Sequence, residues 1–207
     1  MLELVIFDAD GVLFDSTESN TAYYNEIFRR IGEPPMSPAE EQAGVFMSAP
    51  QVFQLRAAGD VDRIARMREI ARTMDAEPFF NLLRPYPDLR SFLRQMKRAY
   101  RIGLATNRSA TIPAIIEYLG LDGIFDAVAS VRDKVRPKPA PDIIELCLAR
   151  AAVHPARAVY VGDSDTDRLA AEAARTNFIG VGQRVDHQYR IASLAELPLV
   201  LERLSGR

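Results

Sequence analysis

Two aspartates, Asp8 and Asp10, follow an apolar run at residues 4–7 and precede Gly11. An apolar run of this length that ends near a glycine is typical of a short buried strand. Two carboxylates one residue apart repel each other, and one of them takes up a proton unless a cation lies between them. The pair therefore indicates a metal site, a proton held for acid–base chemistry, or both, although an Asp-Gly pair after a strand is also a common turn.

Polar residues also follow two other apolar runs. Thr106 and Asn107 end the run that starts at residue 101, and their hydroxyl and amide groups, next to the start of a helix, suit either an anion or a helix cap. Asp163 follows the run at residues 158–161. Asp167 comes four residues later, in the first turn of a predicted helix, where it can face back toward Asp163. Both runs therefore predict strands that end in groups suited to an anion or a cation.

Lys138 lies in a loop, residues 136–142, that contains three prolines. The prolines stiffen the loop and fix the direction of the lysine, which a freely solvated side chain does not need. The chain has only two other lysines, Lys97 and Lys134. A lysine held in this way suits a phosphate or a cluster of carboxylates, on which it acts as a point charge.

These side chains need a scaffold that brings distant residues together, and an alternation of apolar runs and helical patterns predicts one. We predict strands at residues 4–7, 101–105, 125–131, 158–161 and 177–181, and helices at residues 88–98, 109–119, 139–152, 165–174 and from 193 onward. Such alternation is typical of an α/β fold, a parallel sheet with helices on both faces. Ligands bind at the carboxyl ends of such strands, so we expect Asp8, Asp10 and Asp163 to converge on one crevice.

Residues 16–84 have a different pattern, and we predict only helices there. Four helix starts are indicated, by Asp15 with Glu18, Ser37 with Pro38, Ser48 with Gln51, and Asp60. The prolines at residues 85 and 87 make a stiff, extended connector. We therefore predict an α/β core of residues 1–15 and 86–207 and an inserted all-helical cap domain of residues 16–85. The insert leaves the core just after Asp10, so we expect it to lie over the site.

The composition of the 207-residue chain is typical of a globular protein, with 48% hydrophobic and 26% charged residues. The net charge of −2 gives no reason to expect nucleic acid or an anionic membrane as a partner. No apolar stretch approaches the roughly 20 residues that span a bilayer, and the N-terminus has no signal-peptide pattern. Cys147, the only cysteine, lies in a helical pattern, so we expect a buried packing residue, no intrachain disulfide and a cytoplasmic location.

The predicted crevice contains the parts of a phosphoryl-transfer site. Its three aspartates offer the hard oxygen ligands that suit Mg²⁺, an ion that also binds substrate phosphate. Thr106, Asn107 and Lys138 offer donors to an anion. A carboxylate nucleophile, a second carboxylate as acid and base, a divalent ion and a lysine together describe phosphoryl transfer through an aspartyl phosphate.

Four motifs, in their order along the chain, resemble those of the haloacid dehalogenase-like hydrolase superfamily. They are residues 8–16 (DADGVLFDS), residues 106–107 (TN), residues 138–142 (KPAPD), and residues 162–164 (GDS) with Asp167. Each motif alone is weak, whereas four in order at these spacings are specific, and the resemblance covers the whole chain. The sequence is most similar to the phosphoglycolate phosphatase and β-phosphoglucomutase-like branch. The resemblance implies a Rossmann-like parallel sheet and a small helical cap after the first motif.

The resemblance also implies roles for the acidic residues. Asp8 would be the nucleophile, and Asp10 would protonate the leaving oxygen and then activate water. Mg²⁺ would be held by the Asp8 carboxylate, the Asp10 backbone carbonyl and Asp163. Asp167 would orient the lysine of the site or a metal-bound water.

The remaining motif residues would bind phosphate. The resemblance implies this role for Thr106, Asn107 and Lys138, and Lys138 would also neutralise charge on the nucleophile. Within the family, dehalogenases and phosphonatases lack an acid at the position of Asp10 and transporting ATPases carry threonine there, so Asp10 favours a phosphatase or a phosphomutase. Phosphonatases also need a cap lysine, and residues 16–95 contain none.

The expected reaction is hydrolysis of small phosphorylated metabolites. Sugar phosphomutases of this branch usually carry a histidine near the start of the cap, where this chain has Asn20, and an amide cannot carry a proton. A sugar phosphomutase is the alternative, and a catalytically silent binding module is a remote third. Residues 44–47, beginning with Gly44, lie where related caps carry substrate contacts, although packing also explains them, and Arg56 is a candidate contact for a second anionic group. We expect a monomer or a small homo-oligomer.

Overall fold

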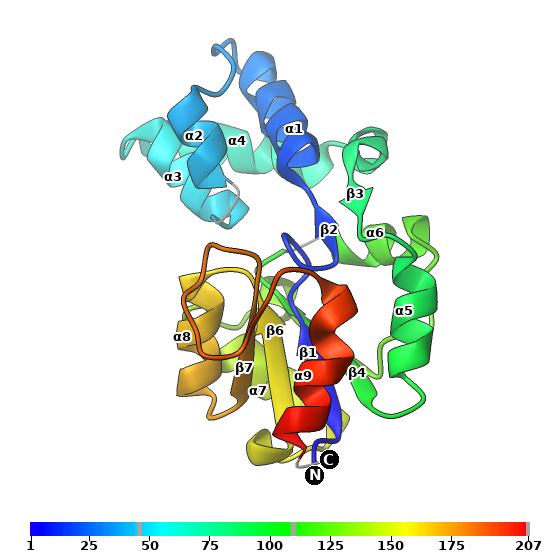
Figure 1. The fold of residues 1–207 in the computed structure, drawn as a ribbon. Helices are drawn as coiled ribbons and strands as arrows, with labels where there is room; N and C mark the ends of the chain where they lie inside the picture. The colour runs from blue at the N-terminus through cyan, green and yellow to red at the C-terminus, as the bar shows by residue number, and fades with distance from the viewer. Residues whose placement is uncertain (45–46, 109–110, 206–207) are drawn as a thin grey trace. The chain divides into compact units, whose positions relative to one another are not determined.

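The computed structural model describes residues 1–44, 47–108 and 111–205 (Figure 1). The chain divides into two compact units, residues 1–14 with 85–207 and residues 15–84. The predicted strands and helices of the first unit are present, with bounds that differ by a few residues. Residues 109–110, where one predicted helix begins, and residues 45–46, within the candidate substrate contact, lie outside the described residues.

The first unit is built on a six-stranded sheet in the order β5-β4-β1-β6-β7-β8. The strands are β1 (Leu4–Phe7), β4 (Arg101–Thr106), β5 (Ala127–Ser130), β6 (Ala158–Gly162), β7 (Asn177–Val181) and β8 (Arg190–Ile191). Neighbouring strands all pair in parallel, which confirms the predicted α/β fold. The sequence does not predict β8, because two residues are too few to show a periodic pattern.

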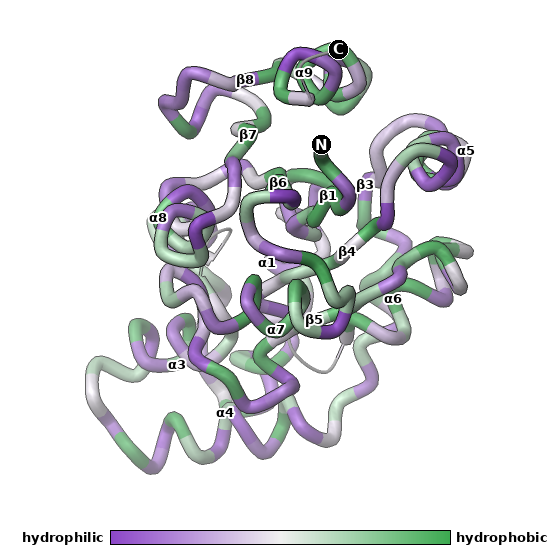
Figure 2. Tube along the Cα trace, turned by 90° about the horizontal axis from the view of Figure 1, so that it is seen from below, coloured by the Kyte–Doolittle hydropathy of each residue, from purple (hydrophilic) through white to green (hydrophobic). Residues whose placement is uncertain are grey.

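Helices cover both faces of this sheet (Figures 1 and 2). They are α5 (Leu89–Met96), α6 (Ile112–Tyr118), α7 (Asp142–Ala151), α8 (Asp165–Ala173) and α9 (Leu197–Leu204). Side chains alternate along β1, so that Ile6 joins a buried cluster with residues of α7 and α8, whereas Phe7 meets Phe92 of α5 edge to face. Cys147 is fully buried in α7, as predicted. Helix α7 begins three residues later than predicted, because the proline at 141 disfavours helical backbone for the residue before it.

The second unit is helical. Its elements are α1 (Thr17–Arg30), α2 (Pro38–Gly44), α3 (Ala49–Ala57), α4 (Val61–Thr73) and a 3-10 helix, η1 (Glu77–Leu82). Its core is a buried cluster that includes Phe28 of α1, Phe53 of α3 and Met67 of α4. In the parts of the chain that the structure describes, no helix is long and apolar enough to cross a membrane.

Three of the four predicted helix starts in this unit are confirmed. Helix α2 begins at its predicted proline. Ser48 and Gln51 form a capping box at the start of α3. Asp60 caps α4, because its carboxylate accepts a hydrogen bond from the backbone N–H of Arg63 at 3.0 Å.

The fourth helix, α1, is present and begins at Thr17, but the predicted capping box of Asp15 with Glu18 is wrong. Ser16 is the N-cap of α1, and the Asp15 carboxylate instead accepts from the backbone N–H and the hydroxyl of Thr17, at 2.9 and 2.7 Å. The reason is that Asp15 belongs to a strand, β2 (Phe14–Asp15), which pairs with β3 (Arg84–Pro85) in a two-stranded sheet. The prediction of only helices up to residue 84 is therefore wrong at its last residue.

Candidate active site

The candidate site lies at the carboxyl ends of three neighbouring strands of the large sheet. Asp8 follows β1, Thr106 ends β4 and Asp163 follows β6, and β4 and β6 are the two strands that flank β1. In the register of the sheet, the last residue of β1 lies opposite Leu104 of β4 and Val161 of β6. The residues that follow these strands therefore meet at one edge, which is the edge where α/β sheets bind ligands.

Lys138 is the buried centre of the site. Its side chain is 2% exposed, and its ammonium group lies 2.8 Å from Asp8 Oδ1 and 2.5 Å from Asp167 Oδ1. A third contact runs to the hydroxyl of Tyr160, at 2.7 Å. An ammonium group has three N–H donors, so three acceptors from different parts of the fold fix where Lys138 points.

Asp167 is held in place by the start of α8. Its Oδ2 accepts from the hydroxyl of Ser164 at 2.6 Å and from the backbone N–H groups of Asp163 and Ser164 at 3.2 Å. Ser164 in turn caps the helix by accepting from the backbone N–H of Asp167. Gly162 makes room for this arrangement, since a Cβ at that position would overlap the Asp167 side chain. Asp167 therefore faces back toward the strand ends, as the sequence predicts.

The carboxylates of Asp8, Asp163 and Asp167 each place an oxygen within 4.8 Å of the others. Asp8 Oδ1 is buried, and the Lys138 ammonium group is its one partner among the described residues. Gly11, at a φ of +74°, brings the backbone after Asp10 so close that a Cβ there would overlap the Asp163 carboxylate. Oxygen ligands of this kind fit Mg²⁺, so the residues that are present are suited to a divalent cation.

The charges in this cluster are unbalanced. Burial raises the pKa of Asp8 from 3.8 to about 8, with Asp167 and Asp10 acting in the same direction and Lys138 against them. Burial, with the charge of Asp167, raises the pKa of Asp163 to about 7. For Lys138, burial acts to lower the pKa, but the charges of Asp167 and Asp8 outweigh it and the pKa is raised. A cation beside Asp8 and Asp163 would favour their ionised forms.

Arg108 also belongs to this site, although none of the sequence motifs contains it. Its Nε lies 2.9 and 2.8 Å from the two carboxylate oxygens of Asp10, and its Nη2 lies 2.8 Å from Oδ1. Its guanidinium group also lies over the ring of Phe14, 5.6 Å from the centroid. The available signal is its position directly after Asn107, on a loop that the sequence places at the site.

Asn107 is next to Lys138, but its side chain contacts the backbone there. The amide nitrogen donates to the Lys138 carbonyl at 3.2 Å, and the amide oxygen accepts from the Lys138 backbone N–H at 2.8 Å. The peptide bond between Lys138 and Pro139 is cis. Thr106 is buried, and its hydroxyl accepts from the backbone N–H of Arg108 at 3.2 Å. The Asn107 amide therefore holds the lysine loop, while phosphate binding by these two residues stays a prediction.

The three candidate specificity residues lie in the helical unit. Asn20 donates from its amide to the Ser16 hydroxyl at 3.1 Å, and Gly44 is buried at the end of α2. Arg56 forms ion pairs at 2.9 Å with Glu33 and Glu40. These ion pairs give Arg56 a structural role in the helical unit, and its contact with a substrate stays a prediction.

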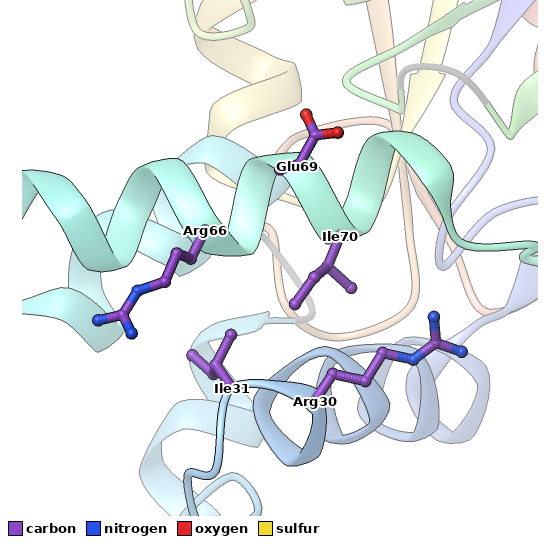
Figure 3. A pocket seen from close by; sticks show the side chains of 5 residues that line it. All are labelled: Arg30, Ile31, Arg66, Glu69 and Ile70. Carbon is purple, nitrogen blue, oxygen red and sulfur yellow. The ribbon is translucent and has the colours of Figure 1, made fainter.

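The helical unit also has a pocket of about 350 Å³ (Figure 3). It is lined by residues of α1 and α4 and by Ile31, which directly follows α1. They are Arg30, Ile31, Arg66, Glu69 and Ile70. None of the candidate specificity residues lines this pocket.

Comparisons with known proteins agree on one family. A family model described as haloacid dehalogenase-like hydrolase matches residues 5–181. A phosphoglycolate phosphatase from Cereibacter sphaeroides is 31% identical over 94% of this chain and 89% of its own length. Pyrophosphatase PpaX from Bacillus velezensis is 26% identical over 97% and 92%. A solved structure of a HAD-superfamily hydrolase, subfamily IA, variant 1, from Geobacter sulfurreducens is 28% identical, covers 97% of this chain and 96% of its own, and has a TM-score of 0.77.

Proposed function

This chain belongs to the haloacid dehalogenase-like hydrolase family, and from this premise we propose that it is a Mg²⁺-dependent phosphatase of small phosphorylated metabolites that works through an aspartyl phosphate. One observation carries the proposal most directly. The buried ammonium group of Lys138 lies 2.8 Å from Asp8, and Asp163 shares a carboxylate cluster with Asp8. A nucleophilic carboxylate, a fixed positive charge and oxygen ligands for a cation are the parts that phosphoryl transfer needs.

In the first step an Asp8 oxygen attacks phosphorus, so that an O–P bond to Asp8 forms while the ester P–O bond breaks. Asp10, in its protonated form, gives a proton to the departing alkoxide and returns to the carboxylate that Arg108 contacts in the structure. Lys138 offsets negative charge on Asp8 and on the phosphoryl group during this step. Asp167 Oδ1 lies 2.5 Å from the Lys138 ammonium group and holds that group next to Asp8. Thr106, Asn107 and Lys138 bind the phosphoryl oxygens, as the sequence predicts.

In the second step Asp10 takes a proton from water, and the water oxygen attacks phosphorus. The bond to Asp8 breaks, and inorganic phosphate leaves. The Asp8 carboxylate, the Asp10 carbonyl and Asp163 would hold a Mg²⁺ ion, which would neutralise charge on the phosphate. Asp10 thus acts as the general acid in the first step and as the general base in the second.

Hydrolysis is favoured over phosphomutase activity because position 20 carries an amide, which donates to the Ser16 hydroxyl and has no proton to shuttle. The relatives named phosphoglycolate phosphatase and pyrophosphatase support a substrate that is small and carries further negative charge. A cytoplasmic location and a monomer or small homo-oligomer, with no nucleic acid or membrane as partner, are part of the proposal.

Phosphate release from a panel of phosphate compounds, with and without Mg²⁺, tests this function. The panel includes 2-phosphoglycolate, inorganic pyrophosphate, sugar phosphates and 4-nitrophenyl phosphate. We expect release from at least one of them with Mg²⁺ and none in excess EDTA. If no compound releases phosphate, the proposal is wrong. If a sugar bisphosphate instead primes isomerisation of a sugar phosphate, the enzyme is a mutase.

The role of Asp8 as the nucleophile can be tested by a single substitution. Asp8→Asn is nearly isosteric but cannot form the aspartyl phosphate, so turnover should fall by at least about 10³-fold. The variant should stay folded, because the buried carboxylate it removes has a raised pKa and is costly to bury. Circular dichroism checks the fold and phosphate release checks the rate. Turnover within tenfold of the unchanged protein would show that Asp8 is not the nucleophile.

A further inference from the structure

We propose that Arg108 is a positioning residue that aims the Asp10 carboxylate, and that it thereby decides how strongly turnover depends on the leaving group. The inference rests on the proposed function, because it needs Asp10 to act as the acid. It adds a residue to the site that none of the four motifs contains.

The contact between the two side chains fixes a direction. Arg108 Nε lies within 2.9 Å of both Asp10 oxygens, and Nη2 lies 2.8 Å from Oδ1. The side chains of Arg108 and Asp10 are 14% and 19% exposed. A planar guanidinium fork that contacts both oxygens of a carboxylate sets its plane and its orientation, which a single ammonium group cannot do.

Arg108 is itself anchored to the sheet. Its backbone N–H donates to the hydroxyl of Thr106, the buried last residue of β4, at 3.2 Å. Its Nη1 donates to the Thr111 hydroxyl at 3.4 Å. The guanidinium group lies 5.6 Å from the centroid of the Phe14 ring, within the range of a cation–π contact. Since β4 pairs with β1, these contacts fix the Asp10 carboxylate relative to the strand that carries Asp8.

The chemical consequence is specific to the acid step. A correctly placed acid contributes about 10²–10⁴-fold when the leaving group is a poor one, such as an alkoxide. It contributes little when the leaving group is 4-nitrophenolate, which departs as a stable anion. A misdirected Asp10 should therefore slow the hydrolysis of alkyl phosphates far more than that of 4-nitrophenyl phosphate. A residue that only stabilises the fold, or only binds phosphate, would slow both reactions equally.

The test compares Arg108→Lys and Arg108→Gln with the unchanged protein on an alkyl phosphate of the panel that the unchanged protein hydrolyses, such as 2-phosphoglycolate, and on 4-nitrophenyl phosphate. The measured quantity is kcat/KM, because it reports the steps up to departure of the leaving group. The later hydrolysis of the aspartyl phosphate does not affect it. We expect kcat/KM for the alkyl ester to fall about 30- to 100-fold and that for the aryl ester to fall less than about threefold. Lysine keeps the charge but not the fork, so both variants should show this split.

Two further variants make the test specific. Arg150 forms a fork on Asp133, on the same unit but outside the site, with Nη2 2.5 Å and Nη1 3.1 Å from the two oxygens. Arg150→Lys should leave the ratio of the two kcat/KM values unchanged. In an Asp10→Asn background, Arg108→Gln should bring no further change in that ratio, since the group it aims is already lost.

Several results would overturn the inference. One is an equal fall of kcat/KM on both esters; another is a further change of the ratio in the Asp10→Asn background. A rise of KM alone would make Arg108 a substrate contact instead. If Arg108→Gln does not fold, Arg108→Lys decides. A failure of the proposed function is distinct, because the unchanged protein would then release phosphate from no compound of the panel.

Discussion

At the scale of single residues, Tyr160 is a buried group that the proposed chemistry does not use directly. Its hydroxyl donates to the Ala105 carbonyl at 2.7 Å and accepts from the Lys138 ammonium group at 2.7 Å. Burial, with the charges of Asp8 and Asp167, raises the pKa of Tyr160 well above its usual value, so the hydroxyl keeps its proton. Tyr160 therefore ties the lysine of the site to the end of β4.

Tyr160→Phe removes this hydroxyl with little change in shape. The ammonium group loses one of its three acceptors, so we expect kcat to fall about tenfold, and the unfolding free energy to fall by about 1–3 kcal/mol because the Ala105 carbonyl loses its donor. Phosphate release and urea denaturation measure the two effects. Tyr23→Phe is the matched control, since the Tyr23 hydroxyl donates to the Ala71 carbonyl in the helical unit. An unchanged kcat would show that Tyr160 does not aim Lys138.

The sequence locates the charged residues of the site but not their partners. Asp8, Asp163 and Lys138 are predictable because each lies at a strand end or in a proline-stiffened loop. Arg108 and Tyr160 are not, because their roles depend on side-chain directions across neighbouring strands, which no local pattern contains. The chain also contains many arginines, so an arginine at position 108 does not by itself indicate a role in the site. The contact of Asn107 could not be predicted for the same reason, because its amide forms hydrogen bonds with both the carbonyl and the N–H group of Lys138.

At the scale of elements, a capping pattern in the sequence predicts a helix start correctly where no strand pairing fixes the backbone before the helix. Asp60 fits its predicted role because it lies between two helices and accepts from the Arg63 N–H. Asp15 does not, because pairing in a strand fixes its backbone before the helix begins. Predictions of this kind therefore fail where an element is set by a partner distant in sequence.

The cap of α4 makes a quantitative prediction for the helical unit. Asp60→Ala leaves the Arg63 N–H without its acceptor, so the unfolding free energy of this unit should fall by about 1 kcal/mol. Asp62→Ala is the control, because Asp62 lies in the first turn of the same helix and its loss removes only the charge that favours the helix dipole, a smaller effect. Hydrogen exchange of the α4 amides measures both. An equal effect of the two substitutions would contradict the capping role.

At the scale of the whole molecule, the buried carboxylates couple stability to pH. The folded-state pKa values of Asp163 and Asp8 are raised from 3.8 to about 7 and about 8. Between pH 4 and 8 the folded protein therefore holds protons that the unfolded chain has released, and stability falls as pH rises. Arginines lower the pKa of surface carboxylates such as Glu26 and Asp133, and these act in the opposite direction, but their effect is complete by about pH 6.

This coupling predicts that the melting temperature of the protein in EDTA falls between pH 6 and pH 8. With Mg²⁺ and inorganic phosphate present the fall should be smaller, because a bound cation replaces the protons on the carboxylates. Asp163→Asn removes one of the two titrating groups and should also flatten the profile in EDTA. Asp165→Asn is the matched control, because Asp165 is exposed at the start of the same helix, α8, and should leave the profile unchanged. A melting temperature that rises from pH 6 to pH 8 in EDTA would mean that Asp8 and Asp163 are already ionised in the metal-free fold, and the case for a cation between them would lose its electrostatic basis.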